Sequence, residues 1–335
     1  MTLHVRPIRA DELPRAHELM VTGGRGLYDE ATLAELPRLW RDLLQARRLA
    51  MHVFVDDTLP PARQIQGMGS GAFVSDAFAD ALVAGGKPMV ACRVMQAELL
   101  GRSVILARAQ TAVANAGAGV NAVGLDLAFA RVDWSVPTAL RWTPLLLESL
   151  RLWLDGWRLR MGLRECVGRD LFLVARAMGA PVFHRHTEVD GQRLPPPQRR
   201  YLVGMTREQS RRLPAALASL LFFSDREPRF HFTMAEQDML LLALGNHADD
   251  ECAVLLNVSP HTVKMRWRSI FEQVAEQRPD WFPGADDHEG QRGVEKRRHL
   301  LAYLARHMEE VRARSHRLSV EAPAQSMPRH THTEV

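Results

Sequence analysis

The chain has 335 residues, of which 46% are hydrophobic and 24% are charged, so it can bury the cores of two domains. Its formal net charge of +4 is a mild basic excess, which is compatible with nucleic-acid binding but does not require it. Cys92, Cys166 and Cys252 are too widely spaced for a disulfide framework or a zinc site, and neither a signal peptide nor a membrane-spanning apolar run is found, so we expect a cytoplasmic protein with no membrane partner.

Residues 1–190 are predicted to form one mixed α/β domain, because stretches of strand and helix periodicity alternate along them. The expected strands cover 3–7, 51–55, 66–74, 120–132 and 181–188. A first helix is expected to begin near residue 10, and further helices are expected over 30–48, 106–116 and 144–160. Another short helix is expected before the last strand. The glycines in 66–74 indicate a bulge or a close backbone approach.

The order strand, helix, helix, strand, strand at the start of this domain resembles the GNAT-type N-acyltransferases. That resemblance implies a turn between a strand and a helix, with the pattern glutamine or arginine-x-x-glycine-x-glycine or alanine, whose amides hold the pyrophosphate of acyl-CoA. The run from Gln64 to Gly69 fits these letters but falls within an expected strand, and the glycine-rich turn 115–119 lies between a helix and a strand. We therefore predict a GNAT-like fold that serves as a sensor or scaffold, with no acyl transfer, no catalytic residue and no cofactor.

A histidine pair is the one candidate metal site in this domain. His184 and His186 are two residues apart on an expected strand, so they share a face, and Glu188 is next in line. A pair without a clear third ligand is more often a polar strand face. We predict no metal site.

Four tryptophans, Trp134, Trp142, Trp153 and Trp157, are concentrated in one stretch of the chain. They could line a ligand pocket. Tryptophans at helical spacing are more often core residues, so we favour the core interpretation.

Charged residues surround one cysteine, since Arg164, Glu165 and Arg169 lie near Cys166. Nearby cations lower the pKa of a thiol and can activate it. No positioned base accompanies this cysteine, so a surface charge cluster is the favoured interpretation.

Residues 191–230 are predicted to form a connector with a short amphipathic helix over 206–222. The run Pro195-Pro196-Pro197 excludes helix and central strand there. Much of the basic excess lies in this region, which suggests either phosphate contacts or, as we favour, a solvated linker. The arginines concerned are Arg193, Arg199, Arg200, Arg207, Arg211 and Arg212.

Residues 233–274 have the pattern of a helix-turn-helix. Thr233 and Glu236 predict a capping box at the start of a first helix, which ends at Gly245. Asp249 is expected to cap a second helix, and a turn over 257–259 leads to a third. Ser259 is its expected N-cap, followed by a proline at the first helical position. Two short helices joined by a tight turn are typical of DNA binding.

The third helix has an apolar stripe and an opposite polar face. The stripe consists of Val263, Trp267, Ile270 and Val274. Arginine and lysine can donate to guanine, and methionine can contact a thymine methyl. The predicted DNA-binding residues are His261, Thr262, Lys264, Met265, Arg266 and Arg268.

The same segment resembles the DNA-binding domain of the LuxR-type transcription regulators. The matching residues are Thr233, Glu236, Gly245, Ser259, Thr262, Val263 and Lys264. The resemblance implies a four-helix domain that binds DNA as a dimer, and Lys264, Met265 and Arg268 match positions that meet bases. One extra residue after Gly245 and the pair Asp249-Asp250 depart from the pattern, which puts phosphate contacts from that turn in doubt.

A spacer and an amphipathic helix over 294–314 follow in the range 277–315, and 316–335 is predicted to be a disordered tail. The apolar face of this helix could pack on the helix-turn-helix or pair with its twin in a dimer. Its basic start, Arg292, Lys296, Arg297 and Arg298, could contact phosphates or be solvated.

These features predict a fold in two parts. An α/β (α+β) sensor-like domain over 1–190 is followed, after the connector, by an all-α LuxR-type helix-turn-helix domain over 231–276 with a C-terminal helix extension. We expect a sequence-specific transcription regulator rather than an enzyme, a homodimer on double-stranded DNA, controlled by an unidentified small-molecule or protein effector. The alternative is a GNAT-type acyltransferase that carries a helix-turn-helix for recruitment.

Overall fold

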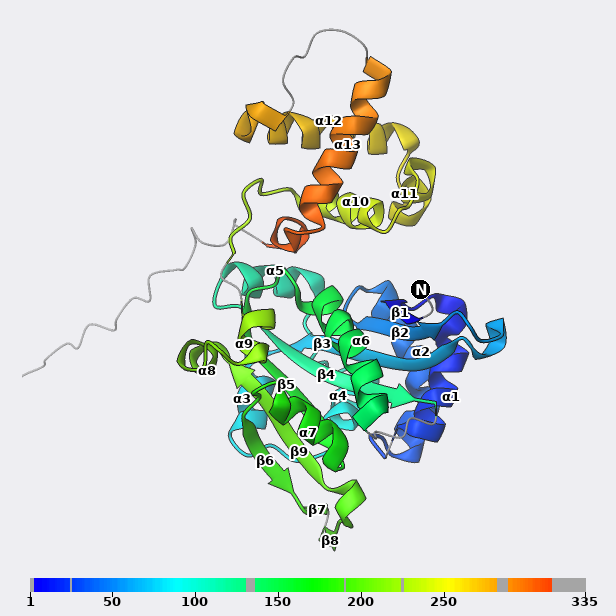
Figure 1. Cartoon of the computed structure of the whole chain (residues 1–335), viewed down its shortest axis with the longest axis vertical. Coiled ribbons are helices and arrows are strands. Elements are labelled where there is room, and N and C mark those ends of the chain that lie inside the picture. The colour runs from blue at the N-terminus through cyan, green and yellow to red at the C-terminus, as the bar shows by residue number, and fades with distance from the viewer. Residues whose placement is uncertain are drawn as a thin grey trace, which may run out of the picture.

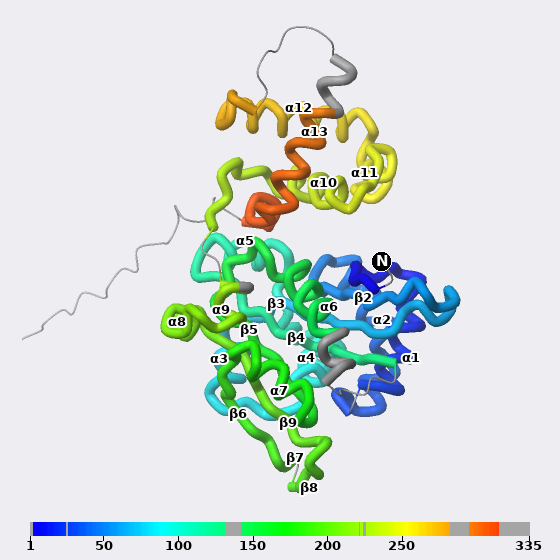
Figure 2. The backbone as a smooth tube through the Cα atoms, in the orientation of Figure 1, coloured from blue at the N-terminus to red at the C-terminus, as the bar shows by residue number. Residues whose placement is uncertain are grey.

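The computed structural model describes residues 3–24, 26–130, 136–189, 191–223, 226–281 and 289–314. Figure 1 shows a twisted sheet with helices on both faces, and a group of helices from the last third of the chain next to it. The tube in Figure 2 shows the same two parts without the ribbon detail. The predicted tail over 316–335 lies outside the described residues.

The sheet has seven strands in the order β1-β2-β3-β4-β5-β9-β6. Their bounds are β1 Leu3–Pro7, β2 Ala50–Asp56, β3 Ile65–Val74, β4 Val120–Phe129, β5 Leu159–Val167, β6 Val182–His186 and β9 Arg200–Thr206. Neighbouring strands are antiparallel except for β4 and β5, which form a parallel pair in the middle. A short hairpin of β7, Glu188–Val189, and β8, Gln192–Arg193, extends beyond β6.

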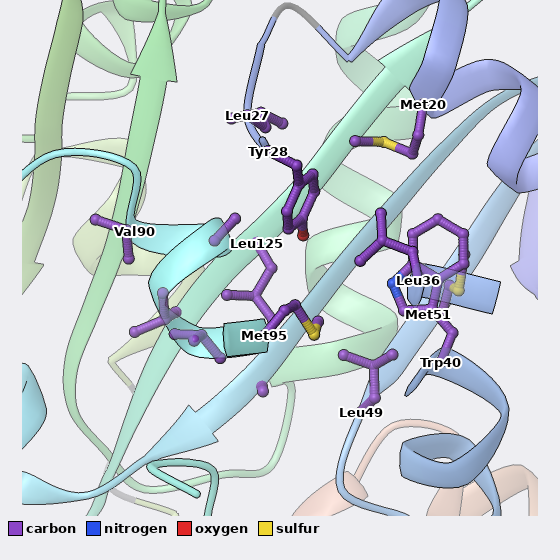
Figure 3. Packing of buried hydrophobic residues seen from close by; sticks show 14 of the residues in the cluster. Met20, Leu27, Tyr28, Leu36, Trp40, Leu49, Met51, Val90, Met95 and Leu125 are labelled. Atoms are coloured by element: carbon purple, nitrogen blue, oxygen red, sulfur yellow. The ribbon is translucent and has the colours of Figure 1, made fainter. Parts of the chain in front are cut away.

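Helices cover the two faces of the sheet with separate cores. One face packs against α1 Leu13–Gly23, α2 Glu30–Gln45, α3 Asp76–Val83 and α4 Val90–Leu99. Figure 3 shows this core, in which Trp40, Leu36 and Met95 surround the ring of Tyr28. The other face packs against α6 Val136–Leu154 and α7 Arg169–Ala177. The remaining short helices are α5 Arg108–Ala116, α8 Arg207–Arg212 and α9 Leu217–Phe222.

The glycine-rich strand β3 is a place of close approach, as its sequence predicts. A Cβ atom at Gly71 would lie 2.1 Å from the ring of Trp153, and one at Gly67 would lie 2.4 Å from the ring of Phe129. The strand also carries a register shift against β4 between Gly69 and Gly71. Glycine is needed here because the ring of Trp153 from α6 and the ring of Phe129 from the neighbouring strand β4 occupy the space of a side chain.

The sheet includes two strands, β5 and β9, that the sequence did not predict. The helix expected over 144–160 ends at Leu154, and the central strand β5 begins at Leu159. The connector expected over 191–230 contains β9, which pairs with both β5 and β6. Two of its arginines are not solvated as predicted, because Arg200 is buried and Arg207 Nε donates to the Leu159 carbonyl over 2.7 Å. The predicted exposure holds for Arg193, Arg211 and Arg212. Helices α3 and α4 are absent from the prediction.

The three helices expected over 233–274 are present as α10 Met234–Leu244, α11 Asp249–Leu256 and α12 Pro260–Gln277. The capping box at Thr233 and Glu236 and the Ser259 cap are confirmed by their hydrogen bonds. The turn begins at Asn257, whose φ of 51° is left-handed. These helices surround a core of their own, which includes Val263, Trp267, Ile270 and Val274.

Asp249 has a different role from the predicted one. The N-cap of α11 is Ala248, and Asp249 is the first helical residue. Its carboxylate accepts a hydrogen bond from Trp267 Nε1 over 3.1 Å and pairs with Arg297 over 2.7 Å. Arg297 belongs to α13, Glu289–Leu304, so one carboxylate holds three helices together. Leu300 and Leu304 of α13 are fully buried in the same core, so this helix packs back on the helical group.

Polar contacts join the helical group to the sheet. Asp238 of α10 forms ion pairs with Arg47, just after α2, and with Arg108 at the start of α5. Arg312 donates to the carbonyls of Leu152 and Asp155 at the end of α6 over 3.0 and 2.9 Å. Within the described ranges, no helix combines the length and apolar character that spanning a bilayer requires.

Candidate functional site

The two parallel strands at the centre of the sheet separate halfway along. Their ladder runs from Val120 opposite Leu159 to Gly124 opposite Arg164. Beyond that point, among the described strands, β4 pairs only with β3, up to Phe129, and β5 pairs only with β9, up to Val167. The facing backbone groups of the two carboxyl halves therefore form no ladder with each other. In open α/β sheets, ligands bind at such a place, outside the carboxyl ends of parallel strands.

A β-bulge places a buried acid at this opening. Gly69 pairs with Leu127 and Gly71 with Gly124, so Ser70 of β3 faces two residues of β4, one of which is Asp126. Bulges re-aim side chains and are common next to active sites. The Asp126 carboxylate is fully buried and accepts hydrogen bonds from the hydroxyls of Ser70 and Tyr28. Tyr28 comes from the segment between α1 and α2.

Burial dominates the protonation of these groups. Desolvation raises the pKa of Asp126, while hydrogen bonds from Ser70 and Tyr28 and the charge of Arg164 oppose that rise. Burial, and then the Asp126 charge, raise the pKa of Tyr28 well above its usual value, so its hydroxyl stays a donor. A buried carboxyl group whose pKa is raised is a candidate general base or acid.

Arg164 lies on the β5 side of the opening, where the ladder ends. Its guanidinium is folded over β4: a Cβ atom at Gly124 would lie 2.8 Å from Nη1. Its Nε is buried without a hydrogen-bond partner, and it forms no ion pair with any residue that the structure describes. Burial lowers the pKa of Arg164, although Cys166, Asp126 and Tyr28 raise it. Among the described residues, this cation at the centre of the site has no anionic partner.

Two apolar cavities lie between the sheet and the helices α6 and α7. Their volumes are about 110 and 140 Å³. Leu150, Trp153, Arg164, Ala175 and Met178 line both. The first is also lined by His52, whose Nδ1 lies 3.3 Å from Ser149 Oγ. Burial, reinforced by the charge of Arg312, lowers the pKa of His52 to about 4, so its ring is neutral at pH 7.

The environment of Cys166 is buried, which corrects the prediction of a surface charge cluster. Cys166 and Glu165 are 1% and 5% exposed. Burial raises the pKa of Cys166 to about 11, because the charge of Arg164 opposes that effect only partly. A neutral thiol is a poor nucleophile, as the sequence predicts. Glu165 pairs with Arg200 over 3.1 Å and accepts from the amides of residues 89 and 90 at the start of α4, so it is a structural carboxylate.

A wide groove lies where β5 ends. Its volume is about 770 Å³, and its wall includes Gly26 before α2, Gly168 and Arg169 at the start of α7, and Arg200 of β9. Pro196 and Pro197, from the predicted connector, form the side next to the hairpin. The groove is open enough for a bulky molecule and lies at the carboxyl end of the strand that carries Arg164.

The acyl-CoA motif letters lie in a strand. Residues 65–69 of the run that begins at Gln64 are part of β3, as the sequence predicts, so this run is not a phosphate-binding turn. The GNAT pattern places its phosphate-binding turn between a strand and a helix, and in this chain the junction between β4 and α6 has that order. Residues 131–135 of that junction lie outside the described residues, and their sequence, Arg-Val-Asp-Trp-Ser, contains no glycine. This chain therefore departs from the family pattern at that place.

The other predicted groups are dispersed. His184 Nε2 lies 2.8 Å from the Val83 carbonyl, and its ring centroid is 6.0 Å from that of His186. Among the described residues, no group of three acidic, histidine or cysteine side chains could hold a metal. Trp142 and Trp153 are buried core residues, and Trp153 also lines both cavities. Trp134 lies outside the described residues.

The predicted DNA-binding residues all lie on α12, and none of them belongs to its buried stripe. Four of them, His261, Lys264, Met265 and Arg268, are exposed. The other two are partly engaged, since the Thr262 amide takes part in the Ser259 cap and Arg266 reaches the Ala235 carbonyl over 3.5 Å. Arg268 pairs with Glu272 over 2.9 Å.

Sequence reasoning did not identify Asp126, Tyr28, Ser70 or Arg164 as a site. One signal was available, since Asp126 is an acid within an otherwise apolar strand, and a buried acid needs partners. The bulge that turns it towards Tyr28, 98 residues away, is not visible in the pattern.

Comparison with known proteins gives matches to solved structures. No protein-family description and no curated protein matches the sequence. Arabidopsis thaliana NAA60, solved with a bisubstrate analogue and with acetyl-CoA, is 13% identical and aligns over 61% of this chain and 98% of its own, with a TM-score of 0.38. Spermidine/spermine N-acetyltransferase SpeG from Vibrio cholerae is 10% identical over 64% of this chain and 97% of its own, with a TM-score of 0.34.

A third match is RimL, a ribosomal L7/L12 alpha-N-protein acetyltransferase, which is 9% identical over 62% of this chain and 94% of its own, with a TM-score of 0.33. The mixed seven-stranded sheet with helices on both faces resembles the GNAT fold. Because these matches are N-acetyltransferases, the expectation that the chain is not an enzyme is corrected. TM-scores of 0.33 to 0.38 carry no argument about substrates, so any activity has to rest on this chain's own residues.

Proposed function

We propose that the α/β part is a GNAT-type N-acyltransferase, which moves an acyl group from a CoA thioester to an amine. The observation that carries this proposal is the opening between β4 and β5, with the buried carboxylate of Asp126 at its bulge. Where a parallel pair separates in this way, backbone amides and carbonyls lie outside its ladder and can bind a ligand that has amide groups of its own. The pantetheine arm of CoA has two such amides.

The residues at the opening fit an acyl-CoA substrate. The two cavities next to it are almost entirely apolar, which suits an acyl chain and the end of the pantetheine arm. Arg164 Nε is buried and has no hydrogen-bond acceptor among the described residues. A bound ligand with an anionic or carbonyl oxygen would supply that acceptor. The groove at the end of β5 is a separate open space, and we propose that the amine enters there.

The chemistry follows from the protonation of the side chains. The amine nitrogen attacks the thioester carbonyl carbon, a C–N bond forms, and the C–S bond breaks. The amine loses a proton to Asp126, and CoA leaves as its thiol or thiolate, so atoms and charge balance. Transfer is direct, because the pKa of Cys166 near 11 keeps that thiol protonated and disfavours an acyl-cysteine. Tyr28 and Ser70 orient the Asp126 carboxylate.

The test is release of CoA thiol from acetyl-CoA in the presence of peptide α-amines, lysine side chains or polyamines. We expect amine-dependent release by the full chain. Asp126→Asn should lower kcat by about 100-fold or more, the usual share of a positioned base. Asp57→Asn, at an exposed acid after β2, is the matched control and should retain full activity. No release with any amine, together with no acetyl-CoA binding, would contradict the proposal.

For the helical group, a second function is supported by the exposed face of α12. Lys264 and Arg268 project from that face with Met265 between them, and the opposite stripe is buried. A helix held at the end of a tight turn, with cations outward, fits the DNA major groove. We propose that this group binds double-stranded DNA and recruits the acyltransferase there, most simply as a homodimer on an inverted repeat.

Selection from a random duplex library at near-physiological salt tests this second function, since phosphate contacts alone give binding at low salt. An enriched inverted repeat is the expected result. Lys264→Ala and Arg268→Ala should then each lose about 1–3 kcal/mol and relax base preference, whereas Arg41→Ala, at an exposed arginine of α2, should do neither. Absence of enrichment from a folded protein would refute a sequence-specific role.

A further inference from the structure

Arg164 is the only charged side chain, among the described residues, that lines both cavities. The second cavity contains no other charged or titratable group among its described lining residues. In the first, His52 is neutral at pH 7, and the Cys166 thiol is protonated. The electrostatics of an otherwise apolar space are therefore set by one guanidinium.

The guanidinium of Arg164 occupies the space that a side chain at Gly124 would fill. Gly124 carries no side chain, and a Cβ atom there would meet Nη1 at 2.8 Å and Cγ at 3.5 Å. Asp126, the nearest carboxylate along β4, accepts from Tyr28 and Ser70 and forms no ion pair with Arg164. Burying a cation without a partner raises the free energy of the folded protein, and a hydrogen-bonding anion that binds there offsets this increase. Arginine binds a carboxylate through two parallel N–H bonds.

We propose that the acyl group of the donor carries a terminal carboxylate, as a succinyl group does, and that Arg164 binds this carboxylate within the cavities. The proposal rests on the acyltransferase function and names the class of acyl group that this site takes. The cavities, of about 110 and 140 Å³, share five lining residues and can hold a chain of a few carbon atoms. Their apolar walls contact the methylene groups, and Arg164 supplies the one charged partner.

Calorimetric titration of the full chain with three CoA thioesters tests the proposal without an acceptor amine. Succinyl-CoA carries the carboxylate, butyryl-CoA has the same number of acyl carbons without it, and acetyl-CoA is the short reference. We expect succinyl-CoA to bind about 10- to 100-fold more tightly than butyryl-CoA, the range for a charge-assisted pair in a buried site. Arg164→Gln should abolish the preference for succinyl-CoA over butyryl-CoA.

Matched variants separate the charge from the fold. Arg160→Gln, on the same strand, removes an arginine that pairs with Asp80 and lines neither cavity, so it should keep the preference for succinyl-CoA. Gly124→Ala keeps Arg164 but displaces its guanidinium, so it should reduce the preference even if Arg164→Gln does not fold. Circular dichroism checks that each variant is folded.

The remaining outcomes are distinct. Equal binding of succinyl- and butyryl-CoA by the wild type would overturn the assignment to Arg164 and leave the acyltransferase proposal standing. If Arg164→Gln weakened the binding of all three thioesters by the same factor, the assignment would also be overturned. Arg164 would then contact the CoA part that they share. If none of the thioesters binds, the proposed function itself fails, and this inference fails with it.

Discussion

The ring of Trp153, from α6, lies directly against Gly71 of β3, so closely that a Cβ atom at Gly71 would be 2.1 Å from it. This contact sets the distance between α6 and the sheet. Trp153 lines both cavities of the proposed donor site, and Gly71 lines the first. The glycine-rich sequence of β3 therefore shapes the site through packing, and not through a phosphate turn.

A methyl group at Gly71 should disturb this packing. We expect Gly71→Ala to lower the free energy of unfolding by about 1–3 kcal/mol, because the indole ring has to move in a packed layer. Gly69→Ala on the same strand is the matched control. Its nearest neighbour would be 3.6 Å away, an ordinary contact, so its effect should stay within about 1 kcal/mol of zero. Urea unfolding followed by tryptophan fluorescence measures both, and equal effects would refute the close contact.

Removing the Tyr28 hydroxyl should change how Asp126 titrates. That hydroxyl lowers the pKa of the Asp126 carboxyl, against the larger effect of burial. In Tyr28→Phe the pKa should rise, so the acidic limb of the kcat/KM profile moves to higher pH, since a base must be deprotonated. Tyr201→Phe, a tyrosine of β9 that stacks on Phe172, is the control. An unmoved limb, or one displaced to lower pH, would argue that Asp126 is not the base.

His52 should make the fold sensitive to acid. Its pKa is about 4 in the folded protein and 6.5 in the reference state, so between these values the unfolded chain binds the extra proton. Stability therefore falls as the pH drops from 6.5 towards 4, by about 3 kcal/mol for this group. His52→Gln should remove this contribution to the pH dependence of the free energy of unfolding. His4→Gln, at a half-exposed strand position, is the control. Identical slopes for wild type and His52→Gln would contradict the assignment.

The ion pairs of Asp238 should hold the helical group to the sheet. Asp238 bridges Arg47 and Arg108, and its own side chain is 12% exposed. We expect Asp238→Ala to raise the rate of tryptic cleavage between the two parts, after Arg226 or Arg229, by about fivefold, which corresponds to about 1 kcal/mol of opening free energy. Asp250→Ala, at an exposed acid of α11, is the control. An unchanged rate would show that these pairs do not fasten the two parts.

The sequence and the structure agree best where the signals are local. The caps at Thr233 and Ser259 are set by residues three positions apart, so the helices of residues 233–274 are readable from the chain. Strands β5 and β9 are not, because their charged residues suggest a surface. Glu165 and Arg200 are buried there as a pair that only the folded sheet brings together. The same applies to the site, since Asp126 and Tyr28 meet through a bulge and a distant loop.

The proposed acyltransferase function requires the opening between β4 and β5 to bind an acyl-CoA thioester. Hydrogen–deuterium exchange of the full chain with and without acetyl-CoA tests it most directly, because exchange reports on the backbone amides of the opening. We expect acetyl-CoA to slow exchange in residues 125–129 of β4 and 165–167 of β5 and to leave exchange in α12 unchanged. Binding that protects other segments and leaves both strand ends unaffected, or no protection at saturating acetyl-CoA, would contradict it.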